Sequence, residues 1–270
     1  MNLKIKKFNM TQIRDDEIVV LIGKRRTGKS FLVKDLLYHH SDIPVGCVIS
    51  PTEMANGFFG EIVPKIFIHD EYEPSIVSNY MKRQAKFVKN IKNKNPEYID
   101  KDPRAFLIFD DCLYDNSWVK DKNIRSIFMN GRHYKTMFLL TMQYSLGITP
   151  NLRTNIDYVF ILREPDYNNR KKLYEHYCGM FPSFDIFCQV MDECTENFEC
   201  LVISKNCKSN KLEDQVFWYK AENRPKFKMG ADIFWKTSEE YCFDDDDDDF
   251  KSSISQVKKS RGPKIMVKKY

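Results

Sequence analysis

The residues best suited to chemistry form a glycine-rich segment near the start of the chain, residues 23–30. Gly23, Gly28, Lys29 and Ser30 fill the fixed positions of the pattern G-x-x-x-x-G-K-[ST]. In such a loop, backbone N–H groups and the positive end of the following helix surround a phosphate. We expect Lys29 to reach the β- and γ-phosphates of a nucleoside triphosphate and the Ser30 hydroxyl to hold Mg²⁺. The other expected phosphate-binding positions are Lys24, Arg25, Arg26 and Thr27.

A second candidate segment is an apolar run that ends in two acids, residues 105–111. An apolar strand with this ending, downstream of a phosphate-binding loop, is the Walker B arrangement. We expect Asp110 to hold the Mg²⁺ shell, directly or through water, and Asp111 to orient or deprotonate the attacking water. A strand that merely ends in a solvated acidic turn is the alternative interpretation.

A third apolar run, residues 136–143, also has a polar end. Its last residue, Gln143, carries an amide that can both donate and accept hydrogen bonds. As the third polar strand end in one nucleotide-binding fold, Gln143 is expected beside the γ-phosphate, as a sensor or as the group that positions water.

The apolar periodicity of the chain indicates the elements that would hold these groups. We expect core strands at 17–22, 45–50, 105–111, 136–143 and 157–162, an edge strand at 3–8, a short strand at 65–69, and a closing pair at 199–204 and 215–219. We expect helices at 29–40, 74–94, 118–130, 169–177 and 184–194. Residues 52–60, with two glycines and with Phe58 and Phe59 expected to be exposed, are predicted to be a long functional loop.

Length and composition fit one large α/β domain, since the chain has 270 residues of which 42% are hydrophobic. We assign residues 1–243 to this domain. Residues 244–270, an acidic run followed by a basic one, are predicted to be a disordered tail. No apolar run is long enough to span a bilayer and the N-terminus does not resemble a signal peptide, so we expect a soluble, intracellular protein.

Charge and cysteine content add weaker constraints. The net charge of +5 permits a polyanionic partner without requiring one. One side of the expected helix at 74–94 is rich in lysine, which is consistent either with a solvated face or with contact to a polyanion. The eight cysteines form no C-x-x-C pair, so scattered reduced thiols are expected rather than a zinc site.

Several segments, in order along the chain, resemble one family. They are residues 22–30, 48–53, 107–112, 130–133, 141–144 and 152–157. On these segments the chain is similar to the genome-packaging ATPases of nucleocytoplasmic large DNA viruses, the poxvirus-type group within the FtsK–HerA branch of P-loop NTPases. The similarity covers roughly residues 17–162 and continues more weakly to about residue 219.

The resemblance implies a RecA-like P-loop NTPase core with a mainly parallel central sheet flanked by helices. It also implies a hexameric ring that hydrolyses ATP and moves double-stranded DNA into a capsid. Residues 51–60 and 113–122 follow the carboxyl ends of expected strands, where ligands bind in open α/β sheets, so either segment is a candidate for the contacts with DNA in the pore. A capsid or membrane-vertex protein would be a further partner, and the location would be the host cytoplasm, at the viral factory, and the virion.

In such a ring an arginine of the neighbouring subunit would stabilise charge on the γ-phosphoryl group. Arg132 matches best, Arg153 is the second candidate and Arg163 follows. The chain departs from many FtsK–HerA enzymes at Asp111, where they use glutamate. The role of Asp111 as the base is therefore less well supported by the resemblance than the role of Asp110 at the Mg²⁺ ion.

Two other functions are compatible with a P-loop. One is a kinase of a small acceptor, and the other is a non-hydrolysing nucleotide-binding assembly factor. No arginine-rich lid motif is evident, which argues against the kinase. The paired Asp110 and Asp111 argue against the non-hydrolysing factor.

Overall fold

The structure is a computed structural model that describes residues 3–112, 116–144 and 147–242. The charged tail expected at residues 244–270 lies outside the described residues, as do residues 113–115 of one segment expected to contact DNA. In the described part of the chain, no helix has the combination of length and hydrophobicity that a membrane crossing needs.

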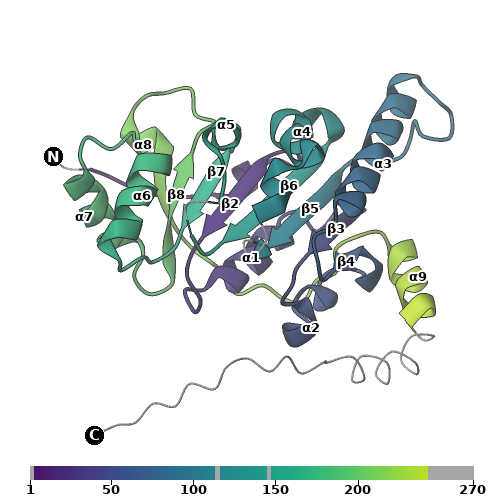
Figure 1. Cartoon of the computed structure of the whole chain (residues 1–270), viewed down its shortest axis with the longest axis horizontal. Helices are drawn as coiled ribbons and strands as arrows, with labels where there is room; N and C mark the ends of the chain where they lie inside the picture. Colours follow the sequence, from purple (N-terminus) through teal and green to yellow (C-terminus); the bar gives the residue numbers. More distant parts are fainter. Residues whose placement is uncertain (1–2, 113–115, 145–146, 243–270) are drawn as a thin grey trace, which may run out of the picture.

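The centre of the molecule is a nine-stranded sheet (Figure 1). Its strands are β1 (Lys6–Lys7), β2 (Ile18–Ile22), β3 (Gly46–Ile49), β4 (Ile68–His69), β5 (Ala105–Asp110), β6 (Thr136–Met142), β7 (Tyr158–Ile161), β8 (Glu199–Ser204) and β9 (Val216–Lys220). Neighbouring strands follow the order β1-β9-β8-β7-β2-β6-β5-β3-β4. Among the described strands, only β8 runs antiparallel to its neighbours. The predicted α/β class with a mainly parallel sheet is therefore confirmed.

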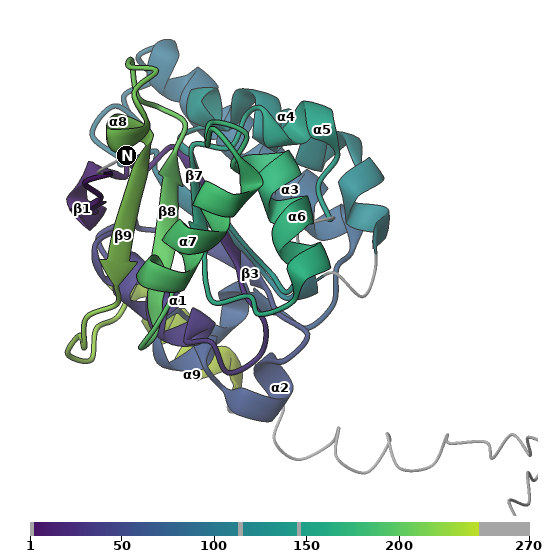
Figure 2. The same cartoon turned by 90° about the vertical axis from the view of Figure 1, so that its left-hand side faces the viewer.

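The sheet is covered by helices on both faces. They are α1 (Lys29–Tyr38), α2 (Glu53–Asn56), α3 (Pro74–Lys92), α4 (Lys122–Asn130), α5 (Pro150–Arg153), α6 (Tyr167–Tyr177), α7 (Phe184–Cys194), α8 (Leu212–Gln215) and α9 (Asp232–Cys242). In Figure 1, α3, α4, α6 and α7 lie in front of the sheet and α1 lies behind it, and Figure 2 shows β8 and β9 from the side. Because both faces are covered, the central strands β2, β5 and β6 are largely apolar, and their only polar residues are Asp110 at the end of β5 and Thr136 and Thr141 in β6.

Strand order brings the three polar strand ends together. Strand β6 lies between β2 and β5, with Ile22 beside Met142 and Asp110 beside Thr141. The three strands are parallel, so their carboxyl ends meet at one edge of the sheet. The loop after β2, the acids after β5 and the polar end of β6 therefore become neighbours.

The segment at residues 52–60 differs from the expectation. It holds the short helix α2 and a 3-10 turn at Phe59–Glu61. The Glu53 carboxylate accepts hydrogen bonds from the Phe59 N–H at 2.9 Å and the Gly60 N–H at 2.7 Å. This closes the segment on itself and leaves Phe59 only 1% exposed. The prediction of an exposed Phe59 was wrong. The residue types of this segment are typical of a loop, but the buried Glu53 carboxylate binds its backbone N–H groups and folds it into a compact unit.

Helix α9 was not predicted. Its Phe234 ring packs 5.0 Å from the Phe67 ring, and the Trp235 indole N–H donates to the Met229 carbonyl at 3.1 Å. The contact with Phe67, far away in the chain, and the nearby hydrogen bond to Met229 stabilise a helix that has little local signal. The expected edge strand at 3–8 is also shorter than predicted, since only Lys6–Lys7 pairs with β9.

Candidate active site

The loop between β2 and α1 has the conformation that its two glycines permit. A Cβ atom at Gly23 would lie 2.8 Å from the Thr27 hydroxyl oxygen and 2.9 Å from the Leu162 side chain, so no larger residue fits there. Gly28 precedes α1 with φ +94°, a backbone conformation that favours glycine. The Thr27 hydroxyl donates to the Lys24 carbonyl at 2.7 Å and fixes the loop from inside. The loop therefore delivers the chain to the N-terminus of α1, where the first N–H groups have no partner within the helix.

A cavity of about 560 Å³ opens at this helix N-terminus. Loop residues form one side of it, and the ends of β5 and β6 together with α2 form the rest. The lining residues are Lys24, Arg25, Arg26, Gly28, Lys29, Ser30, Phe31, Thr52, Asn56, Asp110, Asp111 and Gln143. Of the predicted loop residues, only Gly23 and Thr27 are absent from the lining. Both act on the conformation of the loop, through the close packing at Gly23 and the hydrogen bond of Thr27.

Lys29 and the two acids face one another across this cavity. The Lys29 ammonium lies 4.0 Å from the Asp111 carboxylate. Burial lowers the pKa of Lys29, while Asp111 and Asp110 oppose that shift. An ammonium in this position is only loosely paired, so an incoming anion can compete for it.

Asp110 is held by two hydroxyl groups. The Thr141 hydroxyl donates to Asp110 Oδ1 at 2.6 Å, and the Ser50 hydroxyl lies 3.4 Å from Oδ2. Burial raises the pKa of Asp110, and the Thr141 hydrogen bond and Lys29 act in the opposite direction. Sequence reasoning missed Thr141 and Ser50 as partners of this acid, although both end strands that flank β5 in the sheet.

Asp111 is positioned by its backbone and by Gln143. Its φ of +53° lies in the left-handed region, and its N–H donates to the Thr141 hydroxyl at 3.1 Å. The Gln143 side-chain amide donates to Asp111 Oδ2. These two hydrogen bonds hold the Asp111 side chain on the side of Lys29. The four catalytic groups expected from the P-loop and the strand ends therefore line one cavity: Lys29, Asp110, Asp111 and Gln143.

The residues present also fit a Mg²⁺ ion that arrives with a nucleotide. The Asp110 carboxylate and the Ser30 hydroxyl both line the cavity, and oxygen ligands of this kind suit a hard divalent cation. The described residues contain no cluster of three or more His, Cys, Asp or Glu side chains arranged to hold a metal by themselves. Such a site needs phosphate oxygens to complete it, as Mg²⁺ sites in nucleotide-binding proteins commonly do.

Arg132 and Arg153 lie at the opposite edge of the sheet, before the first residues of β6 and β7. The Arg132 guanidinium pairs with Asp157 and contacts Asn206 at 3.3 Å, and its side chain is 51% exposed. The Arg153 guanidinium lies 5.7 Å from the centre of the Tyr177 ring. Arg163 follows β7 at the same edge as the P-loop and is exposed. Within one chain, therefore, neither Arg132 nor Arg153 reaches the cavity.

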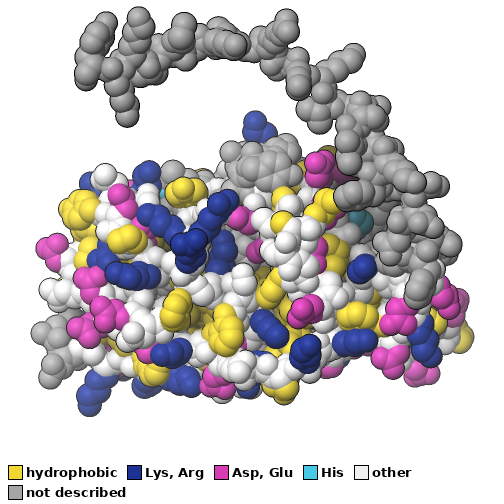
Figure 3. Space-filling model, turned by 90° about the horizontal axis from the view of Figure 1, so that it is seen from below, with side chains coloured by type: hydrophobic (Ala, Val, Ile, Leu, Met, Phe, Trp, Pro, Cys, Tyr) yellow, Lys and Arg dark blue, Asp and Glu magenta, His cyan; other side chains and the backbone are white. Residues whose placement is uncertain are grey.

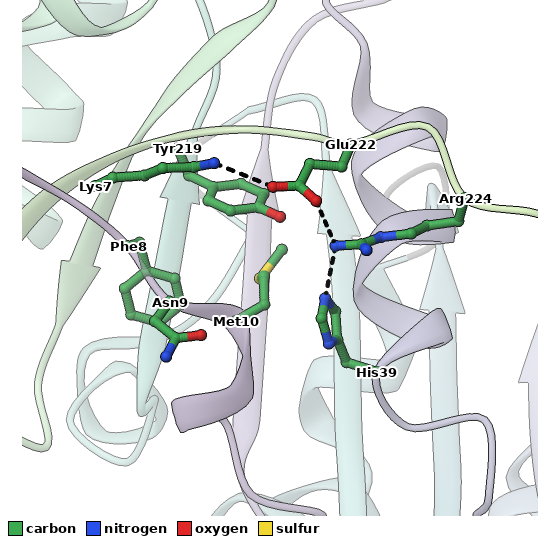
Figure 4. A pocket seen from close by; sticks show the side chains of 8 residues that line it. All are labelled: Lys7, Phe8, Asn9, Met10, His39, Tyr219, Glu222 and Arg224. Atoms are coloured by element: carbon green, nitrogen blue, oxygen red, sulfur yellow. Dashed lines mark hydrogen bonds and ion pairs between the residues drawn. The ribbon is translucent and has the colours of Figure 1, made fainter.

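A second cavity, of about 410 Å³, lies near the other end of α1 (Figure 4). In Figure 4 the Glu222 carboxylate bridges Lys7 and Arg224, at 3.0 Å from each, and Arg224 also meets the His39 ring. The buried Asp35 carboxylate of α1 also accepts from Arg224 at 2.6 Å and from the Tyr219 hydroxyl at 2.6 Å. The charges of this cavity neutralise one another and clamp α1 to the chain that follows β9.

Basic side chains occur on more than one surface. Figure 3 views the molecule from below, toward the carboxyl edge of the sheet, and shows one group of Lys and Arg side chains left of centre. Another basic surface lies on α3, where the exposed lysines are Lys82, Lys86, Lys89 and Lys92. The exposure of these lysines fits both a solvated face and contact with a polyanion.

No family model matches the chain. It is 41% identical to the uncharacterized protein L437 of Acanthamoeba polyphaga mimivirus over 88% of this chain and 84% of that protein. It is 42% identical to the uncharacterized protein 075L of Invertebrate iridescent virus 6 over 74% of this chain and 73% of that protein.

Among solved structures, it is similar to the genome packaging NTPase B204 of Sulfolobus turreted icosahedral virus 2 in complex with AMP, with a TM-score of 0.51 and 16% identity over 78% of this chain and 100% of that one. The B204 DNA-packaging ATPase of Sulfolobus turreted icosahedral virus gives a TM-score of 0.52 and 15% identity over 77% of this chain and 98% of that one. At these identities the likeness establishes a shared fold.

Proposed function

This chain belongs to a family of proteins from large DNA viruses, and we propose that it is the ATPase that moves double-stranded viral DNA into a capsid. One observation carries the proposal. Lys29, Asp110, Asp111 and Gln143 converge on the cavity at the N-terminus of α1, in a fold shared with viral packaging NTPases. A cavity with a loosely paired lysine, two acids and an amide suits hydrolysis of a nucleoside triphosphate.

In the proposed mechanism the loop binds the phosphates of ATP. The helix N-terminus and the N–H groups of the loop attract the phosphate chain, and Lys29 neutralises charge on its β- and γ-phosphates. Ser30 and Asp110 would hold the Mg²⁺ ion, which when bound offsets the charge that develops on the phosphate oxygens. The cost of burying the Asp110 carboxylate is then compensated by a cation.

Asp111 and Gln143 would act on the attacking water. The Asp111 carboxylate accepts the proton of the water or orients it, and the Gln143 amide holds that carboxylate and the water in line with the γ-phosphate. Their hydrogen bond supports a joint role. Because aspartate is shorter than glutamate, the water would lie closer to the end of β5 than in enzymes that use glutamate.

The strand order β2-β6-β5 supports a RecA-like core, which would assemble as a hexameric ring with ATP between subunits. Arg132 or Arg153 would reach the γ-phosphate of the neighbouring subunit, with Arg163 as a third candidate. The position of Arg132 and Arg153 at the far edge of the sheet supports action across an interface rather than within one chain. Arg132 would have to exchange its contact with Asp157 for the phosphate.

DNA contact would be mainly with phosphates and so would weaken with salt. The exposed lysines of α3 and the segments 51–60 and 113–122 are the candidate contact surfaces. A capsid or membrane-vertex protein would position the ring. The expected location is the viral factory in the host cytoplasm, and the virion.

The test is steady-state ATP hydrolysis with and without long double-stranded DNA at several salt concentrations. We expect DNA to stimulate hydrolysis, the stimulation to fade with salt, and Lys29→Ala to abolish turnover. Lys34→Ala, on the same helix but outside the cavity, is the matched control and should behave as wild type. A rate of hydrolysis that is the same with and without DNA at every salt concentration would refute the motor. Phosphoryl transfer to a small acceptor would identify a kinase. Nucleotide binding without turnover would identify an assembly factor.

A further inference from the structure

Phe198 is an exposed aromatic residue in an unusual backbone conformation. It directly precedes β8, and its side chain is 70% exposed. Asn197 and Phe198 both have positive φ angles, +50° and +64°. They are the central residues of a tight turn that the Glu199 N–H closes by donating to the Glu196 carbonyl at 2.8 Å. Two positive φ angles in succession are typical of a type I′ turn, in which Asn is common and a bulky aromatic residue is rare. The chain thus holds a large apolar ring in water by means of a strained turn.

The ring lies against the phosphate-binding loop. A Cβ atom built at Gly28 would be 3.3 Å from Phe198 Cδ1 and 3.9 Å from Phe198 Cγ. Gly28 is the residue at which the loop enters α1. An exposed phenyl group therefore stands directly beside Gly28, at the edge of the cavity and outside its lining residues, although it comes from a part of the chain about 170 residues away.

The strand order tells which part of a nucleotide this ring would meet. The groups expected at the γ-phosphate, Asp111 and Gln143, follow β5 and β6, on one side of β2. Strands β7 and β8 lie on the other side of β2, and β8 begins at the same edge because it is antiparallel to β7. A triphosphate that points its γ end toward β5 and β6 must extend its base toward β7 and β8, where Phe198 lies.

We propose that Phe198 is the surface on which the base of the bound nucleotide stacks. The inference rests on the proposed nucleotide site and adds the group that recognises the base. Every nucleobase has a π face, so an aromatic platform binds purines with little discrimination. Phe198 therefore contributes affinity for ATP and GTP alike, and the base covers a ring that would otherwise be exposed to water.

The experiment separates the base from the phosphates. Dissociation constants for ATP, GTP and inorganic tripolyphosphate are measured by calorimetry on the full chain, for wild type, Phe198→Ala and Phe198→Trp. We expect Phe198→Ala to weaken ATP and GTP roughly tenfold and to leave tripolyphosphate binding within about twofold. Phe198→Trp should restore nucleotide binding, because the larger ring stacks at least as well.

Phe31→Ala is the competing variant, since Phe31 is also an exposed phenyl group (46%) and itself lines the cavity. The inference is overturned if Phe198→Ala leaves ATP binding unchanged, if it weakens tripolyphosphate binding as much as ATP binding, or if Phe31→Ala alone removes the preference for ATP over tripolyphosphate.

These outcomes differ from failure of the proposed function. Absence of DNA-stimulated hydrolysis in wild type refutes the motor but leaves the stacking result standing, and a normal motor with an unaffected Phe198→Ala refutes only the stacking.

Discussion

Two cavities lie toward opposite ends of helix α1, and they are similar in size, about 560 Å³ beside Lys29 and about 410 Å³ beside His39. Both are lined with charged groups, but the pairing of those groups differs. In the cavity beside His39, Arg224 lies within 3.0 Å of both Asp35 and Glu222. In the cavity beside Lys29, the ammonium is 4.0 Å from the closest acid. Lys24, which also lines that cavity, is paired with Glu164 at 2.7 Å, but no ion pair joins Arg25 or Arg26, both exposed there, to a carboxylate in the described part of the chain.

The difference separates a binding site from a structural clamp. Charges that neutralise one another within the protein leave no net charge to attract a charged ligand. Loosely paired cations at a helix N-terminus, by contrast, attract an anion. The volume of a cavity therefore says little about its role. The balance of charge within it says more, and each cavity can be tested by removing one of its groups.

The largest expected effect is on hydrolysis in the Lys29 cavity. Asp111→Asn removes the group proposed to accept the proton of the water, and we expect turnover to fall roughly 10²- to 10⁴-fold. The asparagine can still receive a hydrogen bond from Gln143, so ATP affinity should change little. Single-turnover hydrolysis and ATP titration measure the two quantities. Asp70→Asn, an exposed acid that follows β4 at the same edge, should leave both unchanged, and a fully active Asp111→Asn would remove Asp111 from the mechanism.

The next effect is on stability in the clamp. Arg224→Ala leaves the buried Asp35 carboxylate without its cation, which should lower the free energy of unfolding by about 3 kcal/mol. Urea unfolding measures this change. Lys7→Ala breaks only the half-exposed pair with Glu222 and should cost no more than about 0.5 kcal/mol. ATP affinity should survive in both folded variants, and a selective loss of ATP binding in Arg224→Ala would mean that the two cavities do not have separate roles.

A smaller effect of opposite sign is expected at Asp110. Its pKa in the folded protein is raised by burial, so the charged carboxylate at neutral pH destabilises the nucleotide-free fold. Asp110→Asn should therefore raise the free energy of unfolding by about 1 kcal/mol at pH 7 while abolishing hydrolysis. The gain should shrink as the pH falls to about 4, because wild-type Asp110 then takes up its proton. Equal or lower stability of the variant at pH 7 would contradict this reasoning.

The smallest effect is the pH dependence of the clamp. Burial, followed by the Arg224 charge, lowers the pKa of His39 in the folded state. The unfolded chain then binds a proton more readily, so stability should decrease as the pH falls below about 6.5. Urea unfolding between about pH 5 and 8 should show this decrease in wild type and a weaker one in His39→Gln. An identical pH profile for the two proteins would assign the decrease to other groups, of which His69 also has a lowered pKa.

Much of the fold could be predicted because its signals are local. The runs that form β2, β5 and β6 are largely apolar, as strands buried on both faces are expected to be. The positions of Lys29 and Ser30 could be predicted because they belong to a short loop pattern. Its glycines are required by the backbone conformation of the loop itself. By contrast, α9 depends on packing against Phe67, which is far away in the chain. Helix α2 depends on the burial of Glu53, which residue type alone does not indicate.

The sequence by itself determined which groups are available for chemistry: a phosphate-binding loop, two acids and an amide, each at the end of an apolar run. Their identity is written in short segments, because loop geometry and strand burial depend on near neighbours. Only the tertiary structure decided which groups meet. Strand order placed Thr141 and Ser50 on Asp110, sent Arg132 and Arg153 to the far edge of the sheet, and brought Phe198 to Gly28. Strand order depends on contacts between residues far apart in the chain, which no short segment encodes.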